Sequence, residues 1–529
     1  MDDARTPQAL YRDLRQHIAE LERQGLLHRI DHVVNKDTEM HPLVRWQYRG
    51  GIPDAERKAF LFTNVTDSLG RRYGAPVLVA GLAGSRRIYG VGMQCGLDEI
   101  GERWKEALAH PIEPKMVDSA PVQEIVITGD QLEASGGFLQ FPTPISTPGW
   151  DNAPYLTSAH FITKDPETGV RNVGNYRAQL KSATRCAVRF SGRGCDAAIH
   201  WEKAKARGKH LEVAIVIGAP PIVSFTAVQR MPIELDELAV AGALVGGPIS
   251  LVKCKTVDLE VPADSEVVIE GVIRTDYLEP EGPFGESTGF VHQRTESTVI
   301  EISCITHRRD PIWTSFISQV TPSESSTIKV VAYEPMILDF LRNTCGIKSV
   351  KKVVMHEELT NIRPVVFLQF SKATEGDIWR ALKLTSSFHK GVGKVVIAVD
   401  EDIDPKNLDA IMWSLAYRMT PHRDVQIVRG FDKVGPPFRE VPASENSVML
   451  INATLRDKMP PVSLPKREFM ERSLELWREI GLPPVTPEAP WFGYSLGEWW
   501  DELEEEAQLA TESRWTETGE KNLGQRKPI

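Results

Sequence analysis

Leu211-Glu-Val-Ala-Ile-Val-Ile217 and Glu266-Val-Val-Ile-Glu-Gly-Val-Ile273 are two runs rich in β-branched residues, which favour strands. Similar short runs lie at residues 59–62, 76–80, 122–127 and 298–302. Helical patterns are fewer in this part of the chain, near residues 97–109, 196–207 and 234–245. This mixture predicts an α+β barrel or a layered sheet between about residues 60 and 320.

The pattern changes after Pro322. Two strands are predicted at 365–369 and 394–399, and they alternate with helices near 326–343, 374–387 and 405–418. Such alternation is typical of an α/β layer. We therefore predict an N-terminal region over 1–321, a C-terminal α/β domain over 322–465, and a helical arm over 466–529 whose last fifteen residues are disordered.

The N-terminal segment predicts an amphipathic helix. Thr6-Pro7 has the residue types of a helix start. The apolar residues that follow recur every three or four positions, at Leu10, Leu14, Ile18 and Leu21. We interpret this as a packing helix without a binding role.

Composition narrows the functional class. The chain has 529 residues and a formal net charge of -10, which argues against a general nucleic-acid or anionic-membrane binder. No apolar run reaches the roughly 18 residues of a membrane helix, and the charged start has no signal-peptide core. Six scattered cysteines without a CxxC pair suit a reducing compartment. We expect a cytoplasmic enzyme.

One segment matches a hydrolase signature. Gly285-Glu-Ser-Thr-Gly289 reads as GxSxG, in which Ser287 would be the nucleophile. That motif needs a strand before it and a helix after it. Here a turn-rich segment precedes it and a strand-like run follows, so a serine hydrolase is the weaker alternative. The chain contains no GxGxxG, GxxxxGK[ST] or HExxH motif.

Two other segments suggest acid–base chemistry. Glu281-Gly-Pro-Phe-Gly-Glu286 holds two carboxylates on a tight, extended turn. In a dry or negative pocket, one carboxyl can stay protonated near neutral pH and donate a proton. In Asn172-Val-Gly-Asn-Tyr-Arg177 the glycine allows a ligand to approach the backbone, and the guanidinium could clamp a carboxylate. Each segment alone also fits an ordinary surface turn.

Taken together, these segments resemble the UbiD decarboxylase family. The matching motifs occur in the family's order at residues 172–177, 232–237, 251–254, 258–262, 265–271, 281–286 and 394–404. The resemblance extends from about residue 12 to 500. It implies a split-barrel-like domain that binds prenylated FMN, followed by a C-terminal α/β domain and a helical tail.

The resemblance also implies the catalytic residues Arg177, Glu281 and Glu286. The cofactor would form a covalent adduct with the substrate and accept electrons while CO₂ leaves. Glu286 would then protonate the product carbon, while Arg177 and Glu281 hold the carboxylate and tune the position of the proton. The residues expected to bind the cofactor are Asn172, Tyr176, Arg177, Arg193, Gln229, Glu237 and Lys394.

In the family, a divalent metal, usually manganese, bridges the cofactor phosphate, and potassium lies nearby. The protein ligands are an asparagine, a histidine and a glutamate, and Asn172 and Glu237 match two of them. The histidine should lie about eight residues before Trp201, where this chain has Arg193; His200 aligns poorly. We expect Mn²⁺, with Fe²⁺ or Mg²⁺ as alternatives, or a direct pairing of Arg193 with the phosphate.

The C-terminal stretches 450–454, 460–471 and 490–497 resemble the family branch that acts on aromatic acids. We predict reversible, non-oxidative decarboxylation of an aromatic or α,β-unsaturated acid, with a flavin prenyltransferase as cofactor supplier. A cluster of bases leaves open an aryl-CoA substrate such as phthaloyl-CoA, or a merely solvated face: Arg185, Arg189, Arg193, Lys203, Lys205, Arg207 and Lys209. A subunit of a phenylphosphate-carboxylase-like complex is the alternative.

The tryptophan pair Trp499-Trp500, on an acidic amphipathic stretch, predicts docking on another subunit. We therefore expect a homodimer or homohexamer, with no nucleic-acid or membrane partner.

Overall fold

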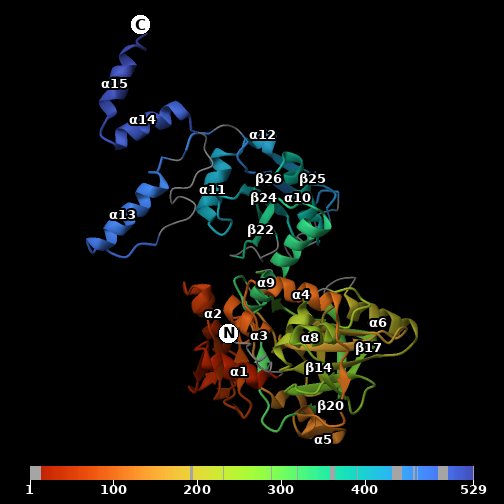
Figure 1. Cartoon of the computed structure of the whole chain (residues 1–529). Helices are drawn as coiled ribbons and strands as arrows, with labels where there is room; N and C mark the ends of the chain where they lie inside the picture. The colour runs from red at the N-terminus through yellow and green to blue at the C-terminus, as the bar shows by residue number, and fades with distance from the viewer. Residues whose placement is uncertain are drawn as a thin grey trace, which may run out of the picture. The chain divides into compact units, whose positions relative to one another are not determined.

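The computed structural model describes residues 13–190, 195–229, 231–286, 289–318, 320–357, 364–389, 391–431, 442, 444–456, 459–461, 463–486 and 499–527. The chain divides into two compact units (Figure 1). The first comprises residues 1–336, 357–363 and 435–440, and the second comprises 337–356, 364–434 and 441–529. Both units combine helices with sheets, so the predicted mixed α and β fold class is confirmed.

The first unit is built on a nine-stranded sheet. Its main path runs β11-β10-β14-β17-β20-β13-β12-β9, β8 also pairs with β20, and every pairing is antiparallel. The strands are β8 (Ile125–Thr128), β9 (Tyr155–Leu156), β10 (Ala159–Lys164), β11 (Arg171–Asn175), β12 (Ala178–Leu180), β13 (Arg185–Val188), β14 (Leu211–Ile217), β17 (Val267–Glu281) and β20 (Thr295–His307).

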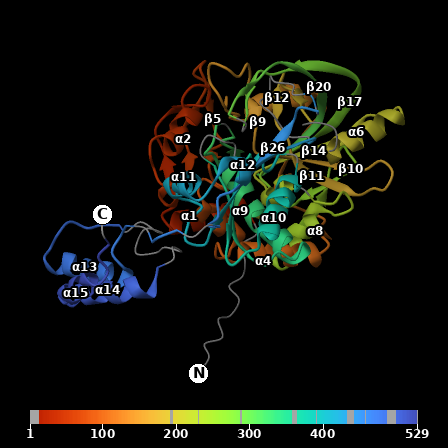
Figure 2. The same cartoon turned by 90° about the horizontal axis from the view of Figure 1, so that it is seen from above.

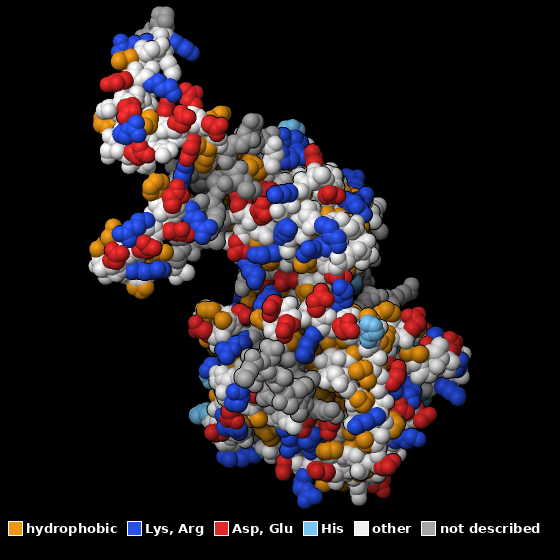
Figure 3. Space-filling model, in the orientation of Figure 1, with side chains coloured by type: hydrophobic (Ala, Val, Ile, Leu, Met, Phe, Trp, Pro, Cys, Tyr) orange, Lys and Arg blue, Asp and Glu red, His pale blue; other side chains and the backbone are white. Residues whose placement is uncertain are grey.

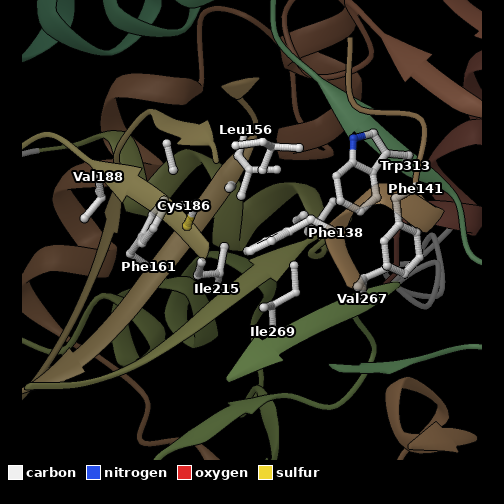
Figure 4. Packing of buried hydrophobic residues seen from close by; sticks show 14 of the residues in the cluster. Phe138, Phe141, Leu156, Phe161, Cys186, Val188, Ile215, Val267, Ile269 and Trp313 are labelled. Atoms are coloured by element: carbon white, nitrogen blue, oxygen red, sulfur yellow. The ribbon is translucent and has the colours of Figure 1, made fainter. Parts of the chain in front are cut away.

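Both faces of this sheet are buried, which explains the near-continuous apolar run of β14. Ile215 and Ile269 belong to one core cluster, together with Phe161 and Cys186 (Figure 4). Val216, the next residue along β14, belongs to a second cluster on the other face. Because successive side chains of a strand point to opposite faces, a strand between two cores needs apolar residues at every position.

Helices supply much of the second cluster. They are α3 (Arg86–Met93), α4 (Ile100–Ala109), α7 (Pro221–Val228) and α8 (Glu237–Val245). Tyr89 of α3 stacks on Phe225 of α7, with ring centroids 4.2 Å apart. On the other side, α6 (Asp196–Ala206) adds Trp201 and Ala204 to the first cluster.

A smaller sheet in the order β1-β3-β6-β21 packs against the first helix. Its strands are β1 (Leu27–Ile30), β3 (Ala59–Phe62), β6 (Val77–Val79) and β21 (Trp313–Ser315), with α1 (Leu14–Arg23) and α2 (Met40–Arg49) beside them in the chain. The predicted helix start at Thr6-Pro7 lies outside the described residues. The helix α1 begins at Leu14 because Asp13 is extended and caps it, accepting a hydrogen bond from the Gln16 N–H at 2.8 Å.

Short elements complete the first unit. They are α5 (Asp130–Ala134), β2 (Val34–Asn35), β4 (Val65–Thr66), β5 (Arg72–Tyr73), β7 (Lys115–Met116), β15 (Ser250–Lys253), β16 (Glu260–Pro262), β18 (Phe284–Gly285), β19 (Val291–His292) and the 3₁₀ turns Asp54–Glu56, Pro121–Gln123 and Gly137–Gln140.

The helix α9 (Glu324–Asp339) begins in the first unit and ends in the second. Its first residue, Glu324, is fully buried and accepts four backbone hydrogen bonds, from the N–H groups of Ala80, Leu82, Ala83 and Ile317. Three of these bonds hold the start of α9 at the turn after β6, and the fourth comes from the segment after β21. Burial raises the pKa of Glu324 to about 7.

The second unit contains a five-stranded sheet in the order β22-β23-β24-β26-β25. The strands β23 (Val365–Phe370), β24 (Val395–Asp400) and β26 (Ser447–Asn452) are parallel, and β22 (Val350–Met355) and β25 (Val425–Arg429) are antiparallel to their neighbours. The helices are α10 (Glu375–Ser387), α11 (Leu408–Tyr417) and α12 (Pro421–Asp424), after a π-helical turn at Phe340–Thr344. The predicted alternation of strands and helices is therefore confirmed.

The chain ends in α13 (Arg467–Glu479), α14 (Asp501–Thr511) and α15 (Trp515–Leu523), none of which has a buried residue among those described. The predicted disorder of the last fifteen residues is wrong over α15. This helix packs against α14 (Figure 2). In addition, Lys521 lies 3.4 Å from the Glu502 carboxylate. Hydrophobic side chains lie at the surface here among charged ones (Figure 3), and Trp499 and Trp500 are exposed. No helix in the described ranges is long and apolar enough to cross a membrane.

Candidate active site

The structure brings together Arg177, Glu281 and Glu286. The two glutamates follow Arg177 by 104 and 109 residues in the sequence. The Nε and Nη2 atoms of Arg177 donate to the two carboxylate oxygens of Glu281 at 3.0 and 3.1 Å. Its Nη1 atom donates to Glu286. Two carboxylates therefore share one guanidinium. The side chain of Glu281 is 0% exposed, whereas that of Glu286 is 25% exposed.

The sheet explains this convergence. Arg177 lies in the short link between β11 and β12, and β12 connects through β13 to β20. The strand β20 also pairs with the end of β17, where Glu281 faces Thr295. The chain then turns into the β18–β19 hairpin, which carries Glu286 directly after β18. The pairing of β12, β13, β20 and β17 thus places the three side chains at one end of the sheet.

Aromatic rings support the guanidinium. Arg177 lies over the ring of Phe284 at 4.9 Å, and the Tyr155 ring lies 4.3 Å from Phe284 on centroids. Burial alone would lower the pKa of Arg177, but Glu281 and Glu286 raise it above its ordinary value. Burial, and then the Glu281 charge, raise the pKa of Tyr155. Arg177 is therefore a permanent cation that is fixed in position on three sides.

The loop between Glu281 and Glu286 is held from the side of the sheet. Gly282 has φ +94°, which favours glycine, and its N–H donates to Gln179 Oε1 at 3.3 Å. A Cβ atom on Gly285 would lie 2.2 Å from Thr147 Oγ1, so a larger residue does not fit without movement. Asp151 accepts a hydrogen bond from the Gly285 N–H at 2.8 Å. Sequence reasoning missed Thr147 and Asp151, because residues 148–154 read as an ordinary turn.

The glycine in the segment at 172–177, Gly174, makes room for a side chain of the same segment. A Cβ atom on Gly174 would lie 2.5 Å from the ring of Tyr176, so the absence of a side chain lets Tyr176 fold back over β11. The expectation that this glycine makes room for a ligand is corrected: Tyr176 takes that space. Burial raises the pKa of Tyr176, whose ring packs edge-on against Phe161 and Phe190.

The predicted metal ligands Asn172 and Glu237 are neighbours. Asn172 lies in β11, and Glu237, at the start of α8, accepts a hydrogen bond from the Val173 N–H at 2.9 Å. Burial raises the pKa of Glu237 to about 8. Gln229, at the end of α7, is also buried, and within the described chain neither its amide nitrogen nor its amide oxygen makes a hydrogen bond.

These side chains fit a polar, charged ligand. A cation would satisfy Glu237, and Gln229 offers both a donor and an acceptor. Over the described ranges, no group of three or more His, Cys, Asp or Glu side chains could hold a metal. A metal at Asn172 and Glu237 would therefore need further ligands, such as phosphate oxygens or water.

Of the remaining residues considered for the site, His200 and Lys394 are described, and Arg193 lies outside the described residues. His200 is buried in α6 with Nδ1 2.8 Å from Thr163 Oγ1, and burial lowers its pKa to about 4. Lys394 belongs to the second unit, where it is exposed just before β24.

Several of the bases near residues 185–209 have partners. Arg185 pairs with Glu279 at 2.6 Å, and Lys203 pairs with Asp165 at 2.6 Å. Arg189 differs from these bases in that it lies next to Arg177. Its backbone N–H donates to the Arg177 carbonyl, and its Nη1 donates to Thr295 Oγ1 at 2.7 Å. Burial and the Arg177 charge lower the pKa of Arg189.

The hydrolase alternative lacks its structural context. Ser287 itself lies outside the described residues. The strand β18 is followed by the antiparallel strand β19, where a nucleophile elbow would need a helix.

Comparisons with known proteins cover most of the chain. Family models of 3-octaprenyl-4-hydroxybenzoate carboxy-lyase match it over residues 18–108 (N-terminal domain), 115–320 (Rift-related domain) and 326–453 (C-terminal domain). An uncharacterized protein of Synechocystis sp. is 31% identical over 512 residues, covering 90% of this chain and 97% of that protein. One from Aquifex aeolicus is 30% identical over 509 residues, covering 89% and 99%.

Two solved structures are similar in fold and sequence. The UbiD-class enzyme HmfF from Pelotomaculum thermopropionicum, in an evolved dimeric form with prFMN, has a TM-score of 0.74 at 30% identity, covering 86% of this chain and 97% of its own. The vanillic acid decarboxylase of Sedimentibacter hydroxybenzoicus, in closed form, has a TM-score of 0.75 at 27% identity, covering 89% and 100%.

Proposed function

Since this chain belongs to the UbiD family of carboxy-lyases, we propose that it removes CO₂, reversibly and without oxidation, from an aromatic or α,β-unsaturated carboxylic acid with the help of prenylated FMN. The observation that carries the proposal is the sharing of Arg177 by Glu281 and Glu286. The complex of HmfF with prFMN and the activity named for the vanillic acid decarboxylase support the cofactor and the substrate class.

The geometry suggests different roles for the two carboxylates. Glu281 is fully buried and binds Arg177 through both oxygens, so it fixes the guanidinium. Glu286 contacts only one nitrogen and is partly exposed, so it can reach a bound molecule. We assign to Glu286 the transfer of a proton to the carbon that loses CO₂, and to Arg177 the orientation of the substrate carboxylate.

The charge balance fits this assignment. Glu281 and Glu286 together carry two negative charges when ionised, against one positive charge on Arg177. A substrate carboxylate adds a third negative charge, which favours a proton on one of the carboxyl groups. That proton is then available for the product carbon. Loss of neutral CO₂ leaves the electron pair of the broken bond behind, the carboxyl proton then goes to the product carbon, and the carboxylate that remains takes a new proton from solvent.

Prenylated FMN, when bound, supplies an electron sink for the electrons that the breaking bond releases. We propose that Asn172, Tyr176, Gln229 and Glu237 of the first unit would hold its polar end. Asn172 and Glu237 would also hold Mn²⁺, and K⁺ would bind as a further cation. Arg193 and Lys394 are proposed as further contacts. A flavin prenyltransferase would supply the cofactor.

We propose a free acid as substrate in preference to a CoA thioester, because Arg185 and Lys203 already form ion pairs with Glu279 and Asp165. Arg177, Glu281 and Glu286 could act in the same way if the chain were a subunit of a phenylphosphate-carboxylase-like complex. We further propose a cytoplasmic homo-oligomer that associates through the exposed tryptophans Trp499 and Trp500.

The test is co-expression with and without a flavin prenyltransferase. The absorbance spectrum and intact mass of the bound flavin identify the cofactor, and a library of aromatic and unsaturated acids is screened for CO₂ release. We expect activity only with the prenylated flavin, and loss of that activity in Arg177→Ala. Equal activity with plain FMN, or with no flavin, would contradict the proposal.

A further inference from the structure

A carboxylate outside the Arg177 cluster holds the loop that carries Glu286. Asp151 Oδ1 accepts a hydrogen bond from the Gly285 N–H at 2.8 Å, and Oδ2 accepts one from the Thr147 N–H at 2.7 Å. The Asp151 N–H in turn donates to the Thr147 carbonyl at 3.0 Å. A single side chain therefore joins the turn at 147–151 to the hairpin strand that ends at Gly285.

This junction lies directly beside the proposed proton donor. Gly285 precedes Glu286, so the position of its backbone sets where the Glu286 carboxyl points. Thr147 Oγ1 lies 2.2 Å from the place that a Cβ atom of Gly285 would take. Phe284 is packed between Tyr155 and Arg177. The Asp151 bond is a polar contact that fixes this backbone from the side of the 147–151 turn, in addition to the bond from the Glu286 N–H to the Phe290 carbonyl at 3.0 Å.

The carboxylate of Asp151 sits in a charged but poorly solvated place. The groups around it are Arg177 with its two bound carboxylates, Glu281 and Glu286, and the Tyr155 hydroxyl. Burial raises the pKa of Asp151 to about 6, although the bonds from Gly285 and Thr147 and the Arg177 charge act in the opposite direction. A protonated carboxyl has an O–H in place of one acceptor, so it cannot serve both N–H groups equally well.

We propose that Asp151 is a positioning residue for the decarboxylation: its ionised carboxylate holds Gly285 so that Glu286 meets Arg177, and its protonation loosens this loop. The effect on turnover rests on the proposed function of Glu286. The holding of Gly285 does not, because it is a property of the loop itself.

The loop is tested first, on the protein without substrate. Hydrogen–deuterium exchange with mass spectrometry, using overlapping peptides that isolate the Gly285 amide, compares wild type with Asp151→Asn. The control is Asp67→Asn, because Asp67 also accepts two backbone N–H bonds, from Leu69 and Arg71 at 2.9 Å each, in a turn of the same unit. We expect the Gly285 amide to exchange about tenfold faster in Asp151→Asn and at the wild-type rate in the control.

The pH dependence of exchange at the Gly285 amide is an independent test of the role of Asp151. In wild type, the protection of Gly285, corrected for the intrinsic exchange rate, should fall as the pH is lowered through about 6. It should be independent of pH in Asp151→Asn, which has no titrating carboxyl. If that variant does not fold, the wild-type titration decides alone. Protection that is constant from pH 5 to 8 in wild type would overturn the proposal.

Turnover tests whether the reaction depends on this positioning by Asp151. In flavin-loaded enzyme, Asp151→Asn should lower kcat about tenfold with little change in KM or flavin content, and should remove the acidic limb of the kcat profile. Faster exchange with unchanged kcat would show that the loop is held by Asp151 but that the reaction does not depend on it, which overturns the positioning role. An enzyme without decarboxylase activity would refute the proposed function, and the exchange data would still decide on the loop.

Discussion

Replacing Glu286 by glutamine is the sharpest test of the proposed chemistry. Gln has the same shape, and its carbonyl oxygen can still accept a hydrogen bond from Arg177, but it carries no acidic proton. Proton transfer by a positioned side chain contributes about 10² to 10⁴ in rate, or roughly 3 to 5 kcal/mol of the barrier. We expect kcat to fall by this factor.

The same structure predicts little damage elsewhere. Arg177 keeps both bonds to the buried Glu281, so the guanidinium stays in place. Exchanging a charge-assisted bond for a neutral one should cost about 1 kcal/mol of unfolding free energy. Flavin content, measured by absorbance, should match wild type, because the residues proposed to hold the polar end of the cofactor are unchanged.

Two rates measure the proton transfer. CO₂ release gives turnover, and NMR in D₂O gives hydrogen–deuterium exchange at the product carbon, which uses the same transfer in reverse. Both should fall together in Glu286→Gln. The control is Glu279→Gln, since Glu279 on β17 forms a similar ion pair with Arg185 of β13 but lies outside the Arg177 cluster. A Glu286→Gln enzyme that keeps more than a tenth of both rates would refute the assignment.

Three further perturbations follow from the structure. Gly285→Ala puts a Cβ atom 2.2 Å from Thr147 Oγ1, so steady-state assays should show a lower kcat at unchanged flavin content; wild-type kcat would contradict the packing. Burial raises the pKa of Glu324 to about 7 in the folded state, above its value in the unfolded chain. The unfolding free energy from urea titrations should therefore fall by up to about 3 kcal/mol as the pH rises from 4.5 to 7. The variant Glu324→Gln should lack this loss. Glu237→Gln and Asn172→Ala should each lower the manganese content of purified protein at least about tenfold by elemental analysis, and a full complement of metal in either would remove that residue from the site.

The strands that could be predicted from the sequence are those with a strong pattern. The apolar run of β14 has that pattern because both faces of its sheet are buried, and the alternation that gives β23, α10 and β24 survives in the second unit. The helix α7 could not be predicted, because Pro-Ile-Val-Ser-Phe-Thr-Ala-Val at 221–228 is rich in β-branched residues. Burial on nearly every side of α7 overrides that preference.

The site also contains residues that could be predicted from the sequence and residues that could not. Glu281 and Glu286 lie in one short motif whose Gly and Pro residues predict a tight turn, but what singles them out is the order of several motifs, which resembles that of the UbiD family. Asp151 could not be predicted, because its role depends on a contact with Gly285 that spans 134 residues. Local patterns predict turns and faces, but only the pairing of the sheet shows which distant turn meets which loop.

The pairing of the central sheet also has a consequence for how the chain is made. The strand β8, at Ile125–Thr128, pairs with β20, at Thr295–His307, and β13 pairs with β20 as well. At roughly 5 to 20 residues per second, a ribosome needs about 10 to 40 seconds to extend the chain from β8 to the end of β20. During this time β8 and β13 emerge with unpaired edges, which can aggregate. Because contacts of such long range form slowly, the yield of active protein in cells should depend on chaperones and on low growth temperature.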